Sequence, residues 1–418
     1  VGNVTEYLVS DLTCETVYYS CVSAYNDCAV TGYSNVVSCT TSFCCGVPPT
    51  VIWYKTLNPS GNSEGITDVA VSVDNLTIYI CGYDCYSASE RKWRVEKLSQ
   101  SDGSLIWDKT YYMSGWQYNI SRGLDVDTSG VYVCGIAGMS PNFPFWRVEK
   151  RSLDDGSIIW STNQSYGPGS NEAYDVVVDS TGVYICGHVG YNSSYPEKDW
   201  KTRVEKRSLS DGTLIWGREF SNSIDHFQYD ESGRGVCVDT SGVYICMYYR
   251  VSHTDKAWRV EKRSCDDGSL IWAQNANYTG GDDIPLDISV DATGVYICGY
   301  YGGNKWRIEK RSLSDGSILW NIASDLPGDE EIANGLALDS TGVYICGFDK
   351  APGNNQWRIE KRSLSDGSLI WTALSNPSSG SDGASSIAIG STGFYVGGHD
   401  RIPGNAQWRL EKYCLPDE

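Results

Sequence analysis

The stretch Asn334–Trp371, NGLALDSTGVYICGFDKAPGNNQWRIEKRSLSDGSLIW, decides the fold. Its apolar residues alternate along short segments rather than recurring at a helical period, which predicts four strands. Asp-Ser-Thr-Gly joins the first two strands and Ser-Asp-Gly-Ser the last two. Such turns favour hairpins, because glycine tolerates positive φ and aspartate bonds its own backbone. We place the strands at Leu336–Asp339, Val343–Phe348, Trp357–Ser363 and Leu369–Ala373.

The same unit recurs along the chain, with its tryptophan landmarks 48 to 56 residues apart. A fixed period in this range is typical of a propeller or solenoid, and four strands per unit favour a propeller. The landmark that ends Ile-Trp or Leu-Trp falls at Trp53, Trp107, Trp160, Trp216, Trp272, Trp320 and Trp371. The Arg-x-Glu-Lys landmark begins at Arg94, Arg147, Arg203, Arg259, Arg307, Arg358 and Arg409.

The two ends of the repeat predict how the ring closes. The first landmark is a fourth strand without its unit, Val51–Lys55, and the last is a third strand without a fourth, Trp408–Tyr413. Pairing them completes a seventh blade and removes two open sheet edges. The predicted fold is therefore all-β, a seven-bladed propeller of four-stranded blades over residues 51–418, preceded by a small β-sandwich fragment at 1–43 and a Pro/Cys linker at 44–50.

Residues 1–43 resemble the last three strands of a fibronectin type III domain. The matching positions are Leu12, Tyr18, Val22, Ala24, Gly32, Ser34 and Thr41. The resemblance covers half of such a domain, so an apolar face and an open edge are expected.

The repeat itself resembles the bacterial and archaeal SBBP-type propeller repeats from Ile66 onward. It shares their Leu-Asp-x-x-Gly-x-Tyr-x-x-Gly, a lysine-bearing strand, and Asp-Gly-Ser-Leu-x-Trp. It is similar, more loosely, to quinoprotein-like repeats. The SBBP resemblance implies a secreted or surface location more than an activity.

The composition of the chain limits the classes of molecule that it is expected to bind. The 418 residues carry 33 Lys and Arg against 52 Asp and Glu, a net charge of −19. This charge disfavours nucleic acid and anionic membrane surfaces, and no apolar run approaches the roughly 20 residues of a spanning helix. Because the chain starts at Val1 rather than Met, we expect a processed product, extracellular or at the cell surface.

Sixteen cysteines fall into two groups. Six recur at one strand position, where neighbouring copies lie beyond disulfide reach and are expected to be buried thiols: Cys81, Cys134, Cys186, Cys246, Cys298 and Cys346. The N-terminal cluster favours an oxidising compartment, with metal binding as the rival. The disulfide candidates are Cys414 with Cys44 or Cys45, more weakly Cys237 with Cys246, and Cys21 with Cys39. No C-x₂-C pair accompanies the scattered His188, His226, His253 and His399.

Strand alternation places every variable loop on one face of the ring, and rigidly mounted loops favour an interaction surface. Loop acids are Asp282, Asp283, Asp329, Glu330 and Glu331. The aromatic interaction candidates are Tyr111, Tyr112, Trp116, Tyr118, Phe220, Phe227 and Tyr229. The glycosylation candidates are Asn3, Asn75, Asn119, Asn163, Asn192 and Asn277.

Arginine and glutamate of each Arg-x-Glu-Lys point to one face of their strand. Seven such pairs are expected to be structural ion pairs, the alternative being a ring of charge for a ligand. No P-loop, G-x-S-x-G, H-E-x-x-H or dinucleotide motif is present, so we predict no catalytic, cofactor-binding or metal residue and no cofactor.

Three functions stay open. The first is a non-enzymatic extracellular structural or adhesive protein, with a head-to-tail filament subunit as one form of it. The second is a carbohydrate-binding propeller, and the third is a propeller lyase, hydrolase or quinoprotein-like enzyme. The expected partners are further copies of the chain or another extracellular protein, with glycans as the alternative.

Cys414 is predicted to form a disulfide with Cys44 or Cys45, because ring closure brings the end of the last third strand to the start of the closing strand. Such a clasp typically contributes roughly 2–4 kcal/mol. Mass spectrometry of non-reduced peptides should recover a peptide linking Cys414 to one of the two. A free Cys414 thiol would contradict the assignment.

Overall fold

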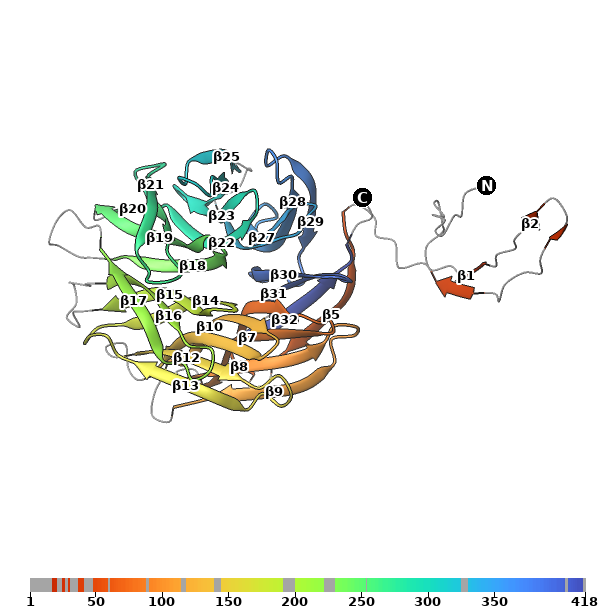
Figure 1. Cartoon of the computed structure of the whole chain (residues 1–418), viewed down its shortest axis with the longest axis horizontal. Coiled ribbons are helices and arrows are strands. Elements are labelled where there is room, and N and C mark those ends of the chain that lie inside the picture. Colours follow the sequence, from red (N-terminus) through yellow and green to blue (C-terminus); the bar gives the residue numbers. More distant parts are fainter. Residues whose placement is uncertain are drawn as a thin grey trace.

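The computed structural model describes residues 17–20, 25–26, 29–30, 37–40, 48–58, 61–87, 90–113, 118–138, 144–190, 200–221, 230–252, 254–324, 330–402 and 405–415. Within these ranges the chain forms strands and turns and no helix, hence no helix that could cross a membrane. Seven four-stranded antiparallel sheets form the blades of a propeller (Figure 1). The predicted fold class is confirmed.

The seven blades have the following strands, listed from the axis outward. They are β6 (Gly65–Val71), β7 (Thr77–Ser87), β8 (Glu90–Ser99), β9 (Leu105–Tyr111); β10 (Ile120–Asp127), β11 (Gly130–Ala137), β12 (Phe145–Arg151), β13 (Ile158–Gln164); β14 (Asn171–Asp179), β15 (Gly182–Gly190), β16 (Trp200–Arg207), β17 (Leu214–Phe220); β18 (Ser232–Asp239), β19 (Gly242–Ser252), β20 (Asp255–Arg263), β21 (Leu270–Ala276); β22 (Ile284–Asp291), β23 (Gly294–Tyr301), β24 (Lys305–Arg311), β25 (Ile318–Ala323); β26 (Glu331–Leu338), β27 (Val343–Asp349), β28 (Gln356–Arg362), β29 (Leu369–Ser375); and β30 (Gly383–Gly390), β31 (Gly393–Ile402), β32 (Asn405–Tyr413), β5 (Val51–Leu57).

The N-terminal region contributes two short pairs. Strand β1 (Val17–Ser20) pairs antiparallel with β4 (Val37–Thr40), and β2 (Tyr25–Asn26) pairs with β3 (Ala29–Val30). Tyr18 is opposite Cys39. The predicted strand before residue 13 lies outside the described residues, as does Cys21, so the Cys21–Cys39 disulfide stays a prediction.

The ring closes as predicted, through β5 on the outer edge of the last blade. Strand β5 pairs with β32 from Trp408 opposite Leu57 to Tyr413 opposite Val51. The backbone of Cys414 then donates to the carbonyl of Thr50 at 3.1 Å. Closure therefore places Cys414 beside the residue that leads into β5, although Cys44 and Cys45 lie outside the described residues.

The repeated turns explain the repeated Asp and Gly residues. In the turn between the first two strands of a blade, Asp127 Oδ1 accepts from the backbone nitrogens of Ser129 and Gly130 at 2.7 and 2.9 Å. In the turn between the last two strands, Gly156 has φ 70°. A Cβ there would lie 2.8 Å from the Trp107 ring of the preceding blade. Only glycine fits both the backbone conformation and this contact.

Adjacent blades are joined by side chains that reach the next blade's backbone. Trp93 Nε1 donates to the carbonyl of Ile136 at 2.8 Å, and Trp357 Nε1 to that of His399 at 3.1 Å. Trp408 makes the same bond across the closure, to Tyr83 at 2.9 Å. The last blade and the first are therefore joined by the contact that joins the others.

The first strands of the blades contact one another around the axis (Figure 1), and there Asp and Gly alternate. In each blade one residue of the first strand pairs with the repeated cysteine of the second strand, or with Gly397 in the seventh blade. These residues are Asp68, Gly123, Asp175, Gly235, Asp287, Gly335 and Ser386. Each of these aspartates accepts from the backbone nitrogen that follows the next blade's glycine, at 2.7 to 2.8 Å. Seven is odd, so alternation fails once, and Ser386 Oγ donates to Asp68 at 2.6 Å.

The repeated cysteines are buried free thiols, as expected, and burial raises their pKa. Cys237, like the repeated Cys246, is a free thiol. The register places Cys237 opposite Tyr244 and Cys246 opposite Gly235, so the two are not direct partners across the strands. The predicted Cys237–Cys246 disulfide is wrong. Cys414 is not among the free cysteines, and its pairing with Cys44 or Cys45 stays a prediction.

The inner aspartates predict a pH-dependent stability. Burial raises the pKa of Asp287 from 3.8 to about 7 and that of Asp68 to about 6. The folded state thus holds protons that the unfolded chain releases, so this stabilisation is full below the unfolded pKa and declines as pH rises through the folded value. Asp287→Ala should be less stable than the parent, by a margin that shrinks between pH 5 and pH 8 in urea unfolding.

The matched control is Asp315→Ala, an exposed turn aspartate whose pKa the Ser317 backbone nitrogen holds below its usual range. Its margin should stay constant over the same pH interval. A margin for Asp287→Ala that stays constant or widens with pH would contradict the assignment.

Candidate functional site

The seven Arg–Glu pairs form buried ion pairs within the blades. Arg307 Nε lies 2.7 Å from Glu309 Oε1, and Arg311 lies 2.6 Å from the other carboxylate oxygen. All seven glutamates are at most 1% exposed. A second arginine completes the group in five blades, as Arg151, Arg207, Arg263, Arg311 and Arg362. Carboxylates so enclosed support the structural interpretation rather than a ring of charge for a ligand.

In five blades the first arginine of the Arg–Glu pair also packs on an aromatic ring of the preceding blade. Arg147 lies 3.8 Å from the centre of the Tyr111 ring, and Arg259 lies 4.0 Å from that of Phe220. Tyr111 also meets Trp93 edge-on, with ring centres 5.9 Å apart. Both rings therefore take part in packing between blades, and their place on an interaction face stays a prediction.

Two of the predicted aromatics remain at the loop face. Tyr118 is 40% exposed, and its ring centre lies 5.8 Å from the Arg91 guanidinium. The Tyr112 ring lies 5.7 Å from Lys92. Trp116, Phe227 and Tyr229 lie outside the described residues. The sequence prediction missed the two cations, which stand at the start of β8.

The predicted loop acids serve separate structural purposes. Asp283 is fully buried and accepts from the backbone nitrogen of Gly302 at 3.0 Å and from Thr279 Oγ1 at 2.9 Å. Glu331 is 1% exposed and pairs with Arg358 at 2.8 Å. Asp282 and Glu330 are paired with lysines near the surface, Lys256 and Lys350. Asp329 lies outside the described residues.

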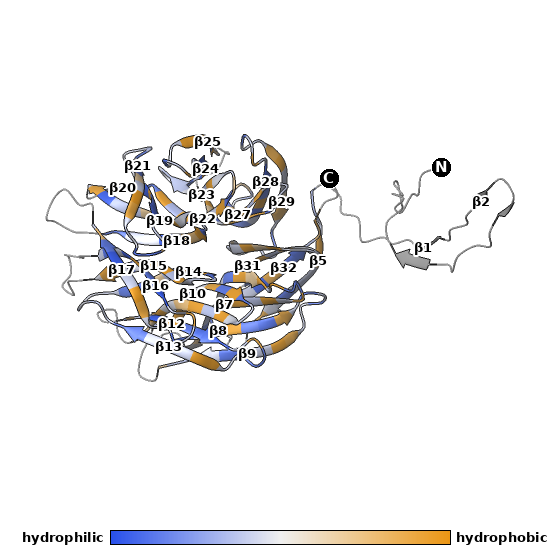
Figure 2. Cartoon of the chain, in the orientation of Figure 1, coloured by the Kyte–Doolittle hydropathy of each residue, from blue (hydrophilic) through white to orange (hydrophobic). Residues whose placement is uncertain are grey.

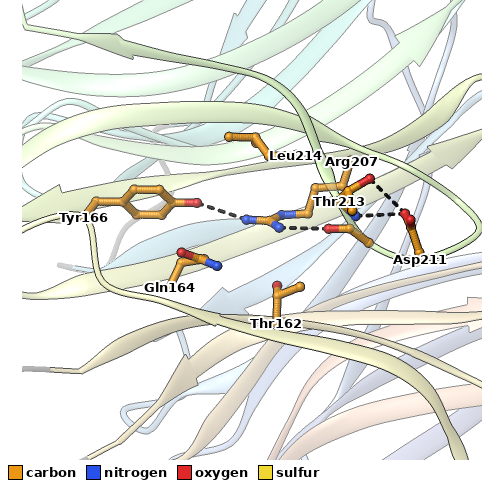
Figure 3. Close-up of a pocket in the computed structure, with 8 residues that line it drawn as sticks. Thr162, Gln164, Tyr166, Arg207, Asp211, Thr213 and Leu214 are labelled. Atoms are coloured by element: carbon orange, nitrogen blue, oxygen red, sulfur yellow. Dashed lines mark hydrogen bonds between the residues drawn. The ribbon is translucent and has the colours of Figure 1, made fainter.

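A groove of about 300 Å³ runs between the second and third blades (Figure 3). Its lining includes Tyr166 and Arg207, whose Nη2 donates to the tyrosine oxygen at 3.0 Å. Arg207 also donates to the carbonyl of Gly212 at 2.9 Å. The same tyrosine–arginine bond recurs between Tyr278 and Arg311 at 3.2 Å. The groove is therefore a seam of the repeat rather than a site particular to one blade.

The glycosylation candidates differ in accessibility. Asn119 is fully buried and donates to the Arg91 carbonyl at 3.1 Å, which leaves no room for a glycan in the fold. Asn163 and Asn277 are exposed on loop-face ends of outer strands, and Asn75 occupies a turn with φ 55°. Asn3 and Asn192 lie outside the described residues.

Polar residues on the innermost strands escaped the sequence prediction. Arg122, Tyr174 and Arg234 occupy the bulge in the first strands of the second, third and fourth blades. The only signal in the sequence is that two blades have an arginine at the bulge position, where the other blades have an uncharged residue. His188, singled out only as a scattered histidine, lies beside Tyr174 with ring centres 5.7 Å apart. The described residues hold no group of three or more His, Cys, Asp and Glu placed to bind a metal.

One solved structure supports the same class of fold. The Dos1 propeller aligns with a TM-score of 0.50 at 9% identity, over 88% of this chain and 96% of that one. BamB from Moraxella catarrhalis aligns at 0.46 and 12% identity, over 88% and 100%. A quinohemoprotein alcohol dehydrogenase from Pseudomonas putida HK5 aligns at 0.47 and 11%, over 82% and 65%.

These likenesses concern the fold alone, since propellers of unrelated function share it. The chain is a seven-bladed β-propeller. No family model and no curated protein matches it, so the SBBP-type and fibronectin-like resemblances stay predictions.

Glu309→Gln tests whether the Arg–Glu groups are structural. Two arginines exposed by 7% and 2% would lose their carboxylate, and breaking a buried pair typically costs about 3–5 kcal/mol. We expect a loss of that order in urea unfolding. Glu330→Gln is the control, because its pair with Lys350 is about 40% exposed on both sides and is expected to contribute about 0–1 kcal/mol. Equal losses in the two variants would refute the structural role.

Proposed function

We propose that the protein is a non-enzymatic extracellular structural protein whose propeller is a rigid, self-associating subunit. The observation that carries this proposal is a belt of exposed apolar side chains on the outer strands. Each of the seven outer strands begins with two consecutive apolar residues, and all fourteen are between 41% and 54% exposed. They are Val51, Ile52, Leu105, Ile106, Ile158, Ile159, Leu214, Ile215, Leu270, Ile271, Ile318, Leu319, Leu369 and Ile370.

The belt is a property of the fold rather than a scatter of single residues. Six pairs begin their strands directly after the turn between the last two strands of a blade. The seventh, Val51 and Ile52, begins β5, which pairs with β32 in the register of the other blades, so the pairs occupy one level of the rim. Hydropathy colouring shows apolar residues along outer strands as well as inner ones (Figure 2). Single exposed apolar residues are ordinary, whereas contiguous or repeated ones mark contact surfaces. The outer strands are also sheet edges, which carry unpaired backbone groups.

A second copy of the chain is the occupant that we propose for the belt. A surface repeated in every blade can meet neighbours in several directions at once, as a lattice or filament subunit must. The segment that precedes the propeller joins it at Val51, which is itself a belt residue. Contacts made by that segment would therefore adjoin the belt, in keeping with the predicted head-to-tail assembly.

Extracellular placement is supported by the N-terminal cysteine cluster and by the sequons at exposed Asn163 and Asn277. A carbohydrate-binding function is the second candidate, favoured by the exposed Tyr118 ring beside Arg91 at the loop face. A sugar could stack on the Tyr118 ring without any contact at the belt, so belt substitutions would leave this function intact.

Sedimentation velocity and electron microscopy of the intact chain test the proposal. We expect concentration-dependent assembly that is lost or weakened at least about tenfold in Ile159→Ser/Ile215→Ser/Ile271→Ser, because burial of each such side chain contributes about 1.5–3 kcal/mol. The control Val251→Ser/Leu374→Ser alters side chains that are 43% and 57% exposed away from the belt.

A monomer at high concentration, or assembly equally affected by both sets of substitutions, would refute the belt as the contact. Deletion of residues 1–45 separates the two contributions. Assembly by the deleted chain assigns the contact to the belt, whereas its loss assigns an essential part to the N-terminal segment.

A further inference from the structure

The repeat breaks most sharply where the third and fourth blades meet. In six blades the third strand carries a tryptophan directly before the arginine of Arg-x-Glu. These tryptophans are at most 1% exposed: Trp93, Trp146, Trp258, Trp306, Trp357 and Trp408. The third blade has Thr202 there, also 1% exposed, and its Oγ1 has no hydrogen-bond partner. Its tryptophan, Trp200, stands two residues earlier and stacks on His188 with ring centres 4.3 Å apart.

His188 lies directly across the sheet from Thr202. Its side chain is 1% exposed, and Nδ1 lies 3.4 Å from Ser232 Oγ. The other ring nitrogen, Nε2, has no hydrogen-bond partner. Buried polar atoms are nearly always paired in proteins, so an unpaired donor or acceptor of this kind points to a group that the chain alone does not supply.

The first strands carry cations at the same level. Around the axis the bulge residues are Thr67, Arg122, Tyr174, Arg234, Leu286, Asn334 and Ser385. The two arginines flank Tyr174, at 5.4 Å for Arg122 and 4.1 Å for Arg234. Charge is thus confined to one side of a ring that is neutral elsewhere.

The two arginines differ in how they are neutralised. Arg122 lies 2.6 Å from Glu172, which also accepts from the Tyr174 hydroxyl at 3.2 Å. Arg234 has no ion pair among the described residues, and its Nε is buried without a hydrogen-bond partner. Its guanidinium lies between the rings of Tyr174 and Tyr248, the latter at 5.1 Å. The guanidinium is hydrogen-bonded to Tyr248, and the Glu172 carboxylate acts on it electrostatically, but the Nε donor stays unpaired. An arginine with an unpaired donor and no direct ion pair is suited to bind an oxyanion.

We propose that the Arg234 guanidinium, walled by Tyr174 and Tyr248, binds a small oxyanion of the carboxylate or phosphate class near His188, whose ring centre lies 5.7 Å from that of Tyr174. The planar guanidinium presents several N–H donors in a fixed geometry that matches both anions. Glu172 is occupied by Arg122, and the nearby Asp230 is occupied by Arg250 and Lys256 at 2.8 and 3.3 Å. Neither acid forms a direct ion pair with Arg234 among the described residues, although the chain as a whole is strongly negative.

His188 supplies a spectroscopic readout. Burial lowers its pKa to about 4; among its charged neighbours, Glu172 and Asp230 act to raise the value, and Arg234 and Arg122 act to lower it. A bound anion adds a negative charge, which favours the protonated ring. Saturation should therefore raise the His188 pKa, an effect that a merely structural Arg234 would not produce. The chain has only four histidines, so the ring signals can be assigned with His188→Gln.

The experiment titrates the full chain with inorganic phosphate in one arm and acetate in the other, by calorimetry and by NMR of labelled histidine. We expect saturable binding in at least one arm and a raised His188 pKa at saturation. Arg234→Gln should weaken binding roughly ten- to hundredfold, as expected for the loss of hydrogen bonds to a charged group, and Arg234→Lys should weaken it less. Preference between the arms identifies the class of anion.

The matched control is Arg218→Gln, an exposed arginine on the outer strand β17. It should leave the affinity unchanged, and unchanged circular dichroism of all variants shows that they fold. The proposal is overturned if neither probe binds saturably, if Arg234→Gln binds as the parent does, or if Arg218→Gln weakens binding as much as Arg234→Gln.

Discussion

Closure of the ring by β5 is the constraint on which every blade depends. Each blade satisfies part of its polar backbone and buries one face only by contact with the next, so an open ring would leave two blades exposed. The contacts that cross the closure are those found elsewhere: Trp408 reaches the Tyr83 carbonyl, and Lys412 reaches that of Gln100 at 3.0 Å. Ser386 substitutes at the one place where the alternation of Asp and Gly cannot continue.

The repeat places its polar residues inside the scaffold. Lys150 shows the principle, since its ammonium donates to Ser129 in its own blade at 2.8 Å and to the Leu209 carbonyl of the next at 3.2 Å. Glutamates of the third strands are enclosed by arginines, and arginines by aromatic rings of the preceding blade. Each group is satisfied by a neighbour that the repeat also supplies. Polar residues that the repeat conserves between blades are therefore poor guides to a ligand, whereas residues that depart from it are better ones.

This division explains what could be predicted from the sequence. Strand order, turn chemistry and closure follow from local signals that occur seven times, such as the Asp-Gly turns and the orphan strand Val51–Lys55. The length of the inner strands did not follow. Strand β26 begins at Glu331, five residues before the predicted Leu336, because the bulge at Asn334 interrupts the alternation from which strands are recognised.

The aromatic residues show a second limit. Tyr111 and Phe220 were assigned to the loop face because they lie near variable loops, yet both pack beneath an arginine more than thirty residues away in sequence. No local pattern encodes that partner. Thr202, by contrast, can be recognised from the sequence, because an alignment of the blades shows a threonine in place of the repeated tryptophan.

The propeller therefore carries two candidate contact surfaces of different origin, the belt and the cluster at Arg234. The belt arises from residues present in all seven blades and faces outward, so the symmetry of the fold multiplies it. The cluster at Arg234 requires four departures from that symmetry, Arg122, Tyr174, Arg234 and Thr202, all on three consecutive blades. A repeated surface suits contacts between identical subunits, because each neighbour meets an equivalent strand edge. A single asymmetric cluster beside the axis suits one small ligand, and it can be altered without changing the belt.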